Sequence, residues 1–160
     1  MFRVGIGQDS HSFDNNKPLV LGSVVISEQN GLKANSDGDV ILHSLCNALS
    51  SAIGGDSLGT WADEMCLKKG IKDSKEYLKY IFNKVKHQGY RVGNIVVSIE
   101  AKIPRLSLMT IKAIKNKIAQ LLAIDINQVG ITFTSGEGLT AFGRGEGIQV
   151  MTVVNLSKND

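Results

Sequence analysis

Two kinds of apolar pattern alternate along this chain, and their alternation constrains the fold more than any other feature. Strand-type segments, which are β-branched and apolar or alternate with period two, are 2–8, 19–26, 90–103, 129–135 and 147–156. Segments with apolar residues at helical spacing are 38–53, 74–88 and 106–123. An Asp/Asn-rich turn at 14–16 is expected to separate the first two strands. The pattern predicts an α/β (α+β) fold with a four- to five-stranded mixed sheet covered by helices on one face.

The length is that of one domain, predicted to span residues 1–160. Such a chain buries roughly 70% of its unfolded surface, and its 42% hydrophobic content can fill a core without disulfides or a structural metal. Cys46 and Cys66 follow no metal or redox spacing and are expected to be reduced thiols. The chain shows neither a leader-like start nor an apolar run of about 18 residues, so we expect a soluble, cytoplasmic protein without a membrane partner.

The distribution of charged and apolar residues indicates which partners the protein has. The net charge is +3, and the lysines between positions 68 and 117 fall mostly on the polar faces of two helices. Solvated helix faces explain them better than a nucleic-acid partner does, because no aromatic platform or binding motif accompanies them. In two strands, positions expected to point outward are also apolar: Val97, Ile99, Met151 and Val153. A sheet buried on both faces in so small a chain indicates an oligomer.

The segment before the first helix carries its start signals. Ser36 or Asp37 is expected to supply the N-cap, and Ser36 with Asp39 resembles a capping box. After this helix, residues 54–70 read as a loop that is long enough to be functional.

Asp9 and His11 stand where the first strand is expected to end, and two interpretations compete. They are either turn and surface residues or parts of one site, since residues i and i+2 of an extended segment share a face. His43 is likewise either a satisfied core histidine or a third ligand, and three ligands with one open position are typical of catalytic zinc. Asp39, one turn earlier, is placed to orient His43, to complement the helix dipole, or to do both.

The glycine-rich segment 132–147 combines small hydroxyl residues with glycines, whose backbone N–H groups can approach phosphate oxygens. Glu137 within it is more plausible as a magnesium ligand than as a phosphate contact, because like charges repel. Arg144 and Glu146, spaced i, i+2 on an expected strand, are either a structural ion pair or an arginine fork for phosphate held by the glutamate.

Taken together, these motifs resemble the 2-C-methyl-D-erythritol 2,4-cyclodiphosphate synthase family of the non-mevalonate isoprenoid pathway. The resemblance covers nearly the whole chain through D-x-H at 9–11, S-D-G-D-V-x-L-H at 36–43 and G-R-G-E-G at 143–147. It implies a lyase that cyclises 4-diphosphocytidyl-2-C-methyl-D-erythritol 2-phosphate with release of CMP. It also implies a homotrimer with active sites between subunits and an isoprenoid diphosphate in a central apolar channel, which Arg144 would face.

The resemblance further implies one zinc per subunit on Asp9, His11 and His43, and Mg2+ or Mn2+ with the substrate near Glu137. Asn35, Thr134 and Ser135 take the catalytic positions at the phosphates, and residues 101–107 hold the cytosine and ribose. Asp39 is implied to orient the metal ligand His43, and Glu146 to hold Arg144. The implied positions that contact the cytidine diphosphate substrate are Asp9, Ser10, His11, Asn35, Ser36, Asp56, Ser57, Leu58, Gly59, Ala62, Asp63, Glu64, Ala101, Lys102, Ile103, Pro104, Arg105, Leu106, Ser107, Thr134, Ser135, Gly136, Glu137, Ala141, Phe142 and Arg144.

The sequence departs from the family pattern in three places. Asn35 stands where a histidine is usual, so a charge-assisted phosphate contact is replaced by a neutral one. In the loop 56–64, Ser57 and Glu64 take the places of two aspartates in an ungapped alignment, and Asp56 substitutes after a one-residue shift. Ala141 replaces a channel-lining phenylalanine, with Phe142 adjacent.

Three functions are compatible with these residues. The first is the synthase. The second, motivated by Asn35 and the altered loop, is a zinc phosphoesterase or diphosphatase with another substrate. The third, motivated by Arg144 and the apolar strands, is a non-catalytic trimer that binds isoprenoid diphosphate, although a pure binding module has no need of the metal-ligand set.

Overall fold

The computed structural model describes residues 1–158, so positions 159–160 of the predicted domain lie outside the described residues. Its elements are β1 (Phe2–Leu21), β2 (Val24–Leu32), α1 (Val40–Ala52), α2 (Gly59–Asp63), η1 (Glu64–Lys68), α3 (Ser74–His87), β3 (Tyr90–Glu100), α4 (Leu108–Leu122), η2 (Ile126–Gln128), β4 (Val129–Thr134), η3 (Gly136–Gly138) and β5 (Gly147–Lys158). The strands form one five-stranded sheet in the order β2-β1-β5-β3-β4. Only β3 and β4 pair in parallel, which confirms the predicted single α+β domain with a mixed sheet.

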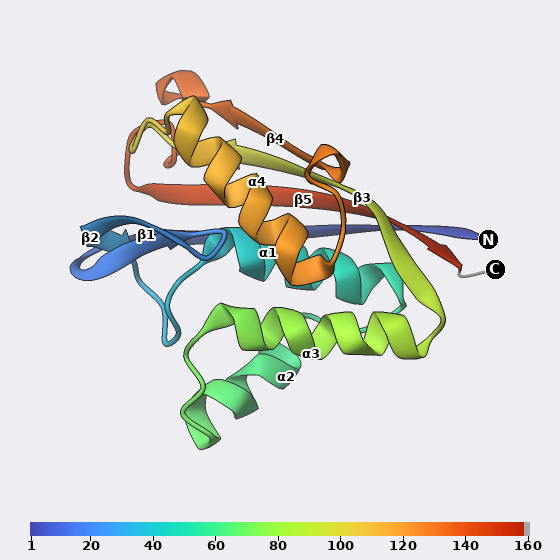
Figure 1. Ribbon diagram of the computed structural model, residues 1–160. Helices are drawn as coiled ribbons and strands as arrows, with labels where there is room; N and C mark the ends of the chain where they lie inside the picture. The colour runs from blue at the N-terminus through green and yellow to red at the C-terminus, as the bar shows by residue number, and fades with distance from the viewer. Residues whose placement is uncertain (159–160) are drawn as a thin grey trace.

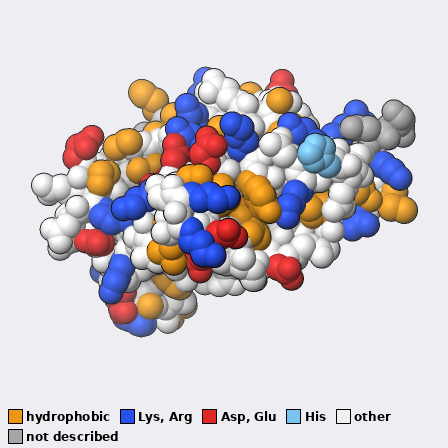
Figure 2. Space-filling view, turned by 90° about the horizontal axis from the view of Figure 1, so that it is seen from below, with side chains coloured by type: hydrophobic (Ala, Val, Ile, Leu, Met, Phe, Trp, Pro, Cys, Tyr) orange, Lys and Arg blue, Asp and Glu red, His pale blue; other side chains and the backbone are white. Residues whose placement is uncertain are grey.

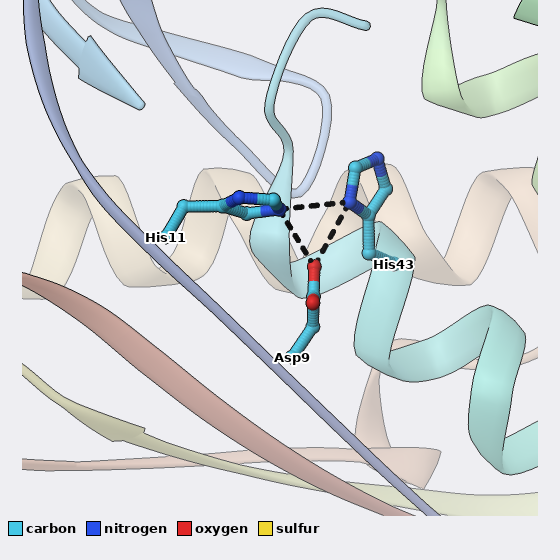
Figure 3. A group of neighbouring side chains, drawn as sticks. All are labelled: Asp9, His11 and His43. Carbon is cyan, nitrogen blue, oxygen red and sulfur yellow. Dashed lines mark hydrogen bonds and ion pairs between the residues drawn. The ribbon is translucent and has the colours of Figure 1, made fainter. Parts of the chain in front are cut away.

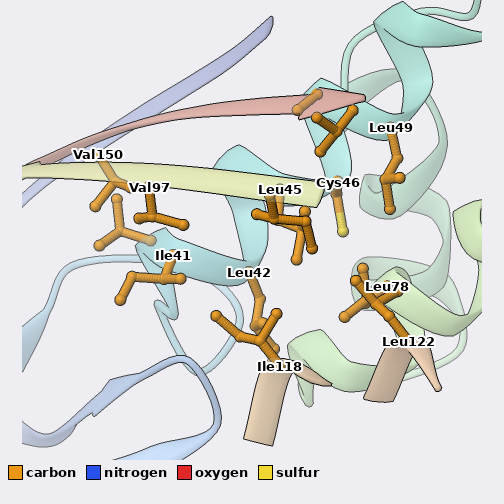
Figure 4. Close-up of a cluster of buried hydrophobic side chains, with 14 of the residues drawn as sticks. Ile41, Leu42, Leu45, Cys46, Leu49, Leu78, Val97, Ile118, Leu122 and Val150 are labelled. Carbon is orange, nitrogen blue, oxygen red and sulfur yellow. The ribbon is translucent and has the colours of Figure 1, made fainter. Parts of the chain in front are cut away.

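The long helices lie on one side of this sheet (Figure 1). Buried apolar residues at helical spacing on α1, among them Leu45 and Leu49, belong to one continuous core with Val97 of β3 and Val150 of β5 (Figure 4). Ile118 of α4 belongs to the same core. The apolar stripes predicted from the sequence are therefore what fix α1 against the sheet.

The expected turn at 14–16 is wrong, because β1 is a single strand of 20 residues. The chain reverses instead at Gly22–Ser23, where φ is 57° and 64°, as a two-residue hairpin turn between antiparallel strands requires. Asp14 to Asn16 form only an irregularity in the β1–β2 ladder, in which the Asn16 N–H donates to the Asp14 carboxylate. Asp9 and His11 thus lie within a strand rather than at its end.

Several predicted element boundaries also differ. The N-cap of α1 is Asp39, whose carboxylate accepts the Leu42 N–H, whereas Ser36 Oγ accepts the Gly38 N–H in the preceding loop. The expected loop at 54–70 contains two helical segments, α2 and η1. Strand β3 ends at Glu100, and α4 begins after its N-cap Ser107, whose hydroxyl accepts the Thr110 N–H.

The outer face of the sheet is apolar, although two of the residues predicted there face the other way. Val97 and Ile99 are fully buried under the helices, because the side-chain period of two places Val96 rather than Val97 outward. The exposed apolar side chains on the outer face include Val4 (67% exposed), Ile6 (58%), Val96 (43%) and Met151 (41%). These residues are neighbours across β1, β5 and β3, since Ile6 and Val96 both pair with Val153.

The lysines of α3 lie on its solvent side, with Lys79, Lys84 and Lys86 exposed. On the face of the molecule in Figure 2, basic and acidic side chains are interspersed. Among residues 1–158, no helix has the length and hydropathy needed to cross a bilayer.

Candidate active site

Strand β1 and helix α1 approach each other unusually closely, and two glycines make this possible. A Cβ at Gly5 would lie 2.0 Å from the Ala48 carbonyl oxygen, and one at Gly7 would lie 2.1 Å from that of Ser44. Because side chains alternate along a strand, the next two positions on the same face are Asp9 and His11. The close packing therefore carries His43, in the first turns of α1, to these two side chains.

The three side chains form a compact triangle, which supports the interpretation that they are parts of one site (Figure 3). Asp9 Oδ2 lies 3.0 Å from His11 Nε2 and 2.9 Å from His43 Nδ1. The two imidazole nitrogens are 3.4 Å apart. His43 is buried, while Asp9 and His11 are partly exposed, so the triangle has an open side.

This donor set fits a zinc ion. Carboxylate and imidazole donors bind zinc at about 2.0–2.2 Å, and in a tetrahedral site two such donors stand about 3.3 Å apart. The three observed separations of 2.9–3.4 Å match one face of such a tetrahedron. The fourth position would lie on the open side.

Electrostatics within the triangle favour an ionised carboxylate. Burial raises the pKa of Asp9, but hydrogen bonds to His11 and His43 outweigh burial and lower that pKa to about 2. The hydrogen bond with Asp9 conversely raises the pKa of His11 above 6.5, against desolvation. The carboxylate is therefore available as a ligand at neutral pH.

The predicted role of Asp39 behind His43 is not supported by the geometry. Its buried carboxylate accepts backbone N–H groups from Gly22, Ser23 and Leu42, at 2.9, 2.6 and 3.1 Å. Burial nevertheless raises its pKa to about 6. Asp39 thus ties α1 to the β1–β2 turn, and the hydroxyls that reach the His43 ring are those of Ser36 and Ser74.

A cavity of about 690 Å3 opens beside the triangle. Besides Asp9, His11 and His43, its lining includes the predicted residues Asn35, Ser36, Ser57, Leu58, Gly59, Ala62 and Asp63. Three predicted neighbours do not line it: Ser10 and Glu64 are exposed elsewhere, and Asp56 lines a smaller cavity with Ser57.

Five residues that line the cavity were not predicted from the sequence: Lys33, Ala34, Asn47, Cys66 and Tyr77. Asn47 had a detectable signal, because it follows His43 by one helical turn. Lys33 and Ala34 adjoin Asn35 in the sequence. Nothing local to Cys66 or Tyr77 marks them, since η1 and α3 bring them to the cavity through the tertiary fold.

The predicted nucleotide and phosphate segments form a second cluster. Residue Ala101 donates its N–H to the Thr134 carbonyl, and Lys102 donates its N–H to the Phe142 carbonyl. These two bonds hold the segment 101–107, which includes Ile103, Pro104, Arg105 and Leu106, against the glycine-rich segment. The Thr140 hydroxyl also donates to the Glu100 carboxylate.

Within this cluster the hydroxyl residues shape a tight turn. The Thr134 hydroxyl accepts the Gly136 N–H, and the Ser135 hydroxyl donates to the Glu137 carboxylate at 3.1 Å. Glu137 is exposed and has a φ of 50°, in the left-handed region. Its carboxylate is accessible to a cation from solvent.

Arg144 and Glu146 form an ion pair, which both interpretations of their spacing include, with Nε and Oε1 2.9 Å apart and both side chains exposed. They do not lie on a strand, because residues 141–146 form turns and a bend before β5 begins at Gly147. Ala141 and Phe142 in the same turn are half-buried.

The two clusters are separated within one chain. Ser10 pairs with Gln149, Gln149 with Glu100, and Glu100 with Thr134, so all four lie at one level of the sheet. Three inter-strand spacings of about 4.8 Å place Thr134 about 14 Å from Ser10. The cavity beside the triangle accordingly contains no residue from 101–107 or 134–144.

Known proteins share this architecture. The sequence profile of the YgbB family matches residues 2–157. The 2-C-methyl-D-erythritol 2,4-cyclodiphosphate synthase of Chlamydia muridarum is 45% identical over 159 residues, 98% of this chain and 88% of that protein. The synthase of Chlamydia caviae is 40% identical over 161 residues, 99% of this chain and 90% of that protein.

Two solved structures have a fold similar to that of this chain. The bifunctional IspDF of Campylobacter jejuni matches with a TM-score of 0.92 and 35% identity, over 100% of this chain but only 43% of that longer one. A CDP complex of IspF from Plasmodium falciparum matches with a TM-score of 0.86 and 28% identity, over 99% of this chain and 97% of that one. With the profile and the curated relatives, these matches show that the chain belongs to the YgbB family, whose matched members are 2-C-methyl-D-erythritol 2,4-cyclodiphosphate synthases.

Proposed function

We propose that this protein converts 4-diphosphocytidyl-2-C-methyl-D-erythritol 2-phosphate to 2-C-methyl-D-erythritol 2,4-cyclodiphosphate and CMP, in isoprenoid precursor biosynthesis. The observation that carries the proposal is the Asp9–His11–His43 triangle, open to a cavity lined by Asn35, Ser36 and Asp63. The relatives named as this synthase, at 40–45% identity, support the reaction. The cytoplasmic location expected from the sequence stays a prediction.

In this reaction an oxygen of the 2-phosphate attacks the β-phosphorus of the diphosphate and forms a new P–O bond that closes the ring. The bond from the β-phosphorus to the oxygen that bridges to the α-phosphate breaks, and CMP leaves with that oxygen. The nucleophile is a phosphate monoester whose second pKa is about 6, so it is already mostly dianionic and needs no strong general base. The difficulty is to bring two anions together and hold the reacting atoms in line. Zinc at Asp9, His11 and His43, and magnesium or manganese near Glu137, would supply the charge neutralisation when bound.

The chain's own residues would position the phosphates. Asn35 borders the cavity and can donate a hydrogen bond to a phosphate oxygen, although it brings no charge. The hydroxyls of Thr134 and Ser135 would contact the phosphates from the second cluster. The segment 101–107 would hold the cytosine and ribose, a role consistent with its attachment to the phosphate-binding turn.

A complete site then requires two subunits. A single phosphate group cannot touch the triangle and a hydroxyl about 14 Å across the sheet, whereas a second copy can bring its own 134–137 turn to the cavity. We therefore propose a homotrimer with active sites between subunits. The apolar outer face around Val4, Ile6, Val96 and Met151 supports an assembly that buries it. Arg144, paired with Glu146, would face the central channel and bind an isoprenoid diphosphate there.

One assay separates the candidate reactions. The purified protein is incubated with zinc, magnesium and the cytidylylated substrate, and the products are followed by phosphorus NMR. Formation of the cyclic diphosphate together with CMP supports the synthase. Inorganic phosphate or linear products would point to a phosphoesterase or diphosphatase, and absence of turnover with retained isoprenoid diphosphate binding would point to a binding protein.

A further inference from the structure

The face of His43 turned away from the triangle contacts a chain of polar side chains that the proposed reaction does not use. His43 Nε2 lies 2.8 Å from the Ser74 hydroxyl, which in turn lies 2.5 Å from Asp37 Oδ1. Ser74 is completely buried. The chain joins three elements, since His43 is on α1, Ser74 begins α3 and Asp37 precedes α1.

The direction of these hydrogen bonds follows from what each group can donate. An ionised carboxylate only accepts hydrogen bonds, so the Ser74 hydroxyl donates its single proton to Asp37. The lone pairs of the same oxygen then face His43, which must donate from Nε2. A neutral imidazole with its proton on Nε2 presents a lone pair on Nδ1, the atom that points to Asp9 and His11.

Asp37 is itself held in one orientation. Its Oδ2 accepts the Ser74 N–H at 3.0 Å, and its Oδ1 also accepts the Asp39 N–H at 3.2 Å. Its own N–H donates to the Lys72 carbonyl oxygen at 2.9 Å. The carboxylate cannot rotate without breaking several of these bonds, so it fixes the direction of the Ser74 hydroxyl.

Ser36 is a second neighbour of His43 Nε2, at 3.2 Å. Its oxygen already accepts the Gly38 N–H, and no carboxylate contact orients its hydroxyl proton among the hydrogen bonds of residues 1–158. The shorter contact with Ser74, anchored by Asp37, is therefore the one that sets the ring.

We propose that Ser74 and Asp37 are positioning residues of the metal site: together they fix His43 in the tautomer and ring orientation that present Nδ1 to the ion. This inference rests on the metal site of the proposed function and adds to it residues that hold a ligand in place. It replaces the role that the sequence suggested for Asp39. Groups that orient a metal-bound histidine contribute roughly 10- to 100-fold to metal affinity in other proteins.

The test measures the zinc affinity of purified protein without substrate, by competition with a chromophoric chelator. Ser74→Ala removes the acceptor, and we expect zinc affinity to fall at least tenfold. Asp37→Asn offers one oxygen where two accept now. With the amide oxygen toward the Ser74 hydroxyl, the amide NH2 faces the Ser74 N–H, and this donor–donor clash displaces Ser74 from His43. With the amide flipped, the NH2 donates to the hydroxyl, whose proton turns toward His43 and competes with the Nε2 proton, so zinc affinity should fall in both cases.

Two variants control for general damage. Ser44→Ala removes another buried hydroxyl of α1, which bonds the Thr152 hydroxyl of β5 and no residue of the triangle. Asp73→Asn makes the same charge change one residue before Ser74, and asparagine caps the N-terminus of α3 equally well. Both should keep zinc affinity within about twofold of the wild type, whatever their melting temperatures.

A spectroscopic readout identifies the interaction itself. In the zinc-loaded wild type, the His43 Nε2 proton should resonate downfield and exchange slowly with solvent, and in Ser74→Ala this protection should be lost. Wild-type zinc affinity in both Ser74→Ala and Asp37→Asn would overturn the proposal. Because no substrate is present, a wild type that binds zinc without forming cyclic diphosphate would refute only the proposed function, while a loss of affinity in Ser74→Ala would still support the positioning role.

Discussion

Gly7→Ala tests the link between strand–helix packing and the metal triangle. The new Cβ would lie 2.1 Å from the Ser44 carbonyl oxygen and 2.3 Å from the Ala48 nitrogen. Both atoms belong to the backbone of α1, so no side-chain rotation relieves the overlap. Ordinary contact begins near 3.4 Å, and the helix would therefore have to move away from β1 by roughly 1.3 Å.

This displacement has a cost in stability and in metal binding. Overpacking of this kind costs about 1–3 kcal/mol, which in a chain of this size corresponds to a fall in melting temperature of roughly 3–10 °C. Because His43 moves with α1 while Asp9 and His11 stay on β1, the triangle opens by about an ångström. Zinc sites tolerate about 0.2 Å, so we expect zinc affinity to fall at least tenfold.

The assay pairs thermal unfolding of the metal-free protein with a zinc competition titration. Gly130→Ala is the matched control, because a Cβ on that strand glycine would find its nearest neighbour, the Ile95 carbonyl oxygen, at 3.8 Å. Gly130→Ala should leave zinc affinity unchanged. A Gly7→Ala protein that keeps both the wild-type melting temperature and the wild-type zinc affinity would refute the reasoning that the glycines set the geometry of the triangle.

Four further predictions concern the site and the assembly. His43→Ala should remove most bound zinc, and full occupancy by elemental analysis would exclude His43 as a ligand. Asn35→His should leave turnover equal or higher by adding charge at the phosphates, so a severe loss would reveal another role for Asn35. Ile6→Asp should dissociate the proposed trimer in sedimentation experiments by charging the apolar outer face, and a variant that sediments like the wild type would place the proposed interface elsewhere. Finally, the metal-free protein should lose stability as pH falls from 3.8 to about 2, because folding depresses the pKa of Asp9; Asp9→Asn should lack this component.

The fold was largely predictable because the apolar periodicity is strong in both strands and helices. The predictions of the fold that were wrong concern segments where neighbouring positions are all apolar, or where local turn signals mislead. Val96 and Val97 are both apolar, so the sequence could not say which one faces the helices. The Asp14–Asn16 stretch has turn composition, yet pairing of the flanking residues with β2 and β5 keeps the chain extended around it.

The strand period predicted that Asp9 and His11 share a face, whereas His43 had two interpretations from its local pattern, and the family resemblance is what implied all three as ligands. The residues that contact His43 from outside the triangle were not predictable. Asp39 looked suited to orient His43, but its carboxylate accepts three backbone N–H groups: that of Leu42, which it caps, and those of Gly22 and Ser23, which only the folded hairpin brings near. Ser74 reaches His43 from 31 residues away. No local pattern carries such a contact, because it depends on how α3 packs against α1.

The most direct test of the central claim is a zinc titration of metal-free protein in the presence of magnesium and the cytidylylated substrate, followed by phosphorus NMR. We predict that the rate of cyclic diphosphate and CMP formation rises with added zinc and saturates at one zinc per chain. Cyclic product formed at full rate without zinc would contradict the account, as would linear products or inorganic phosphate at saturation.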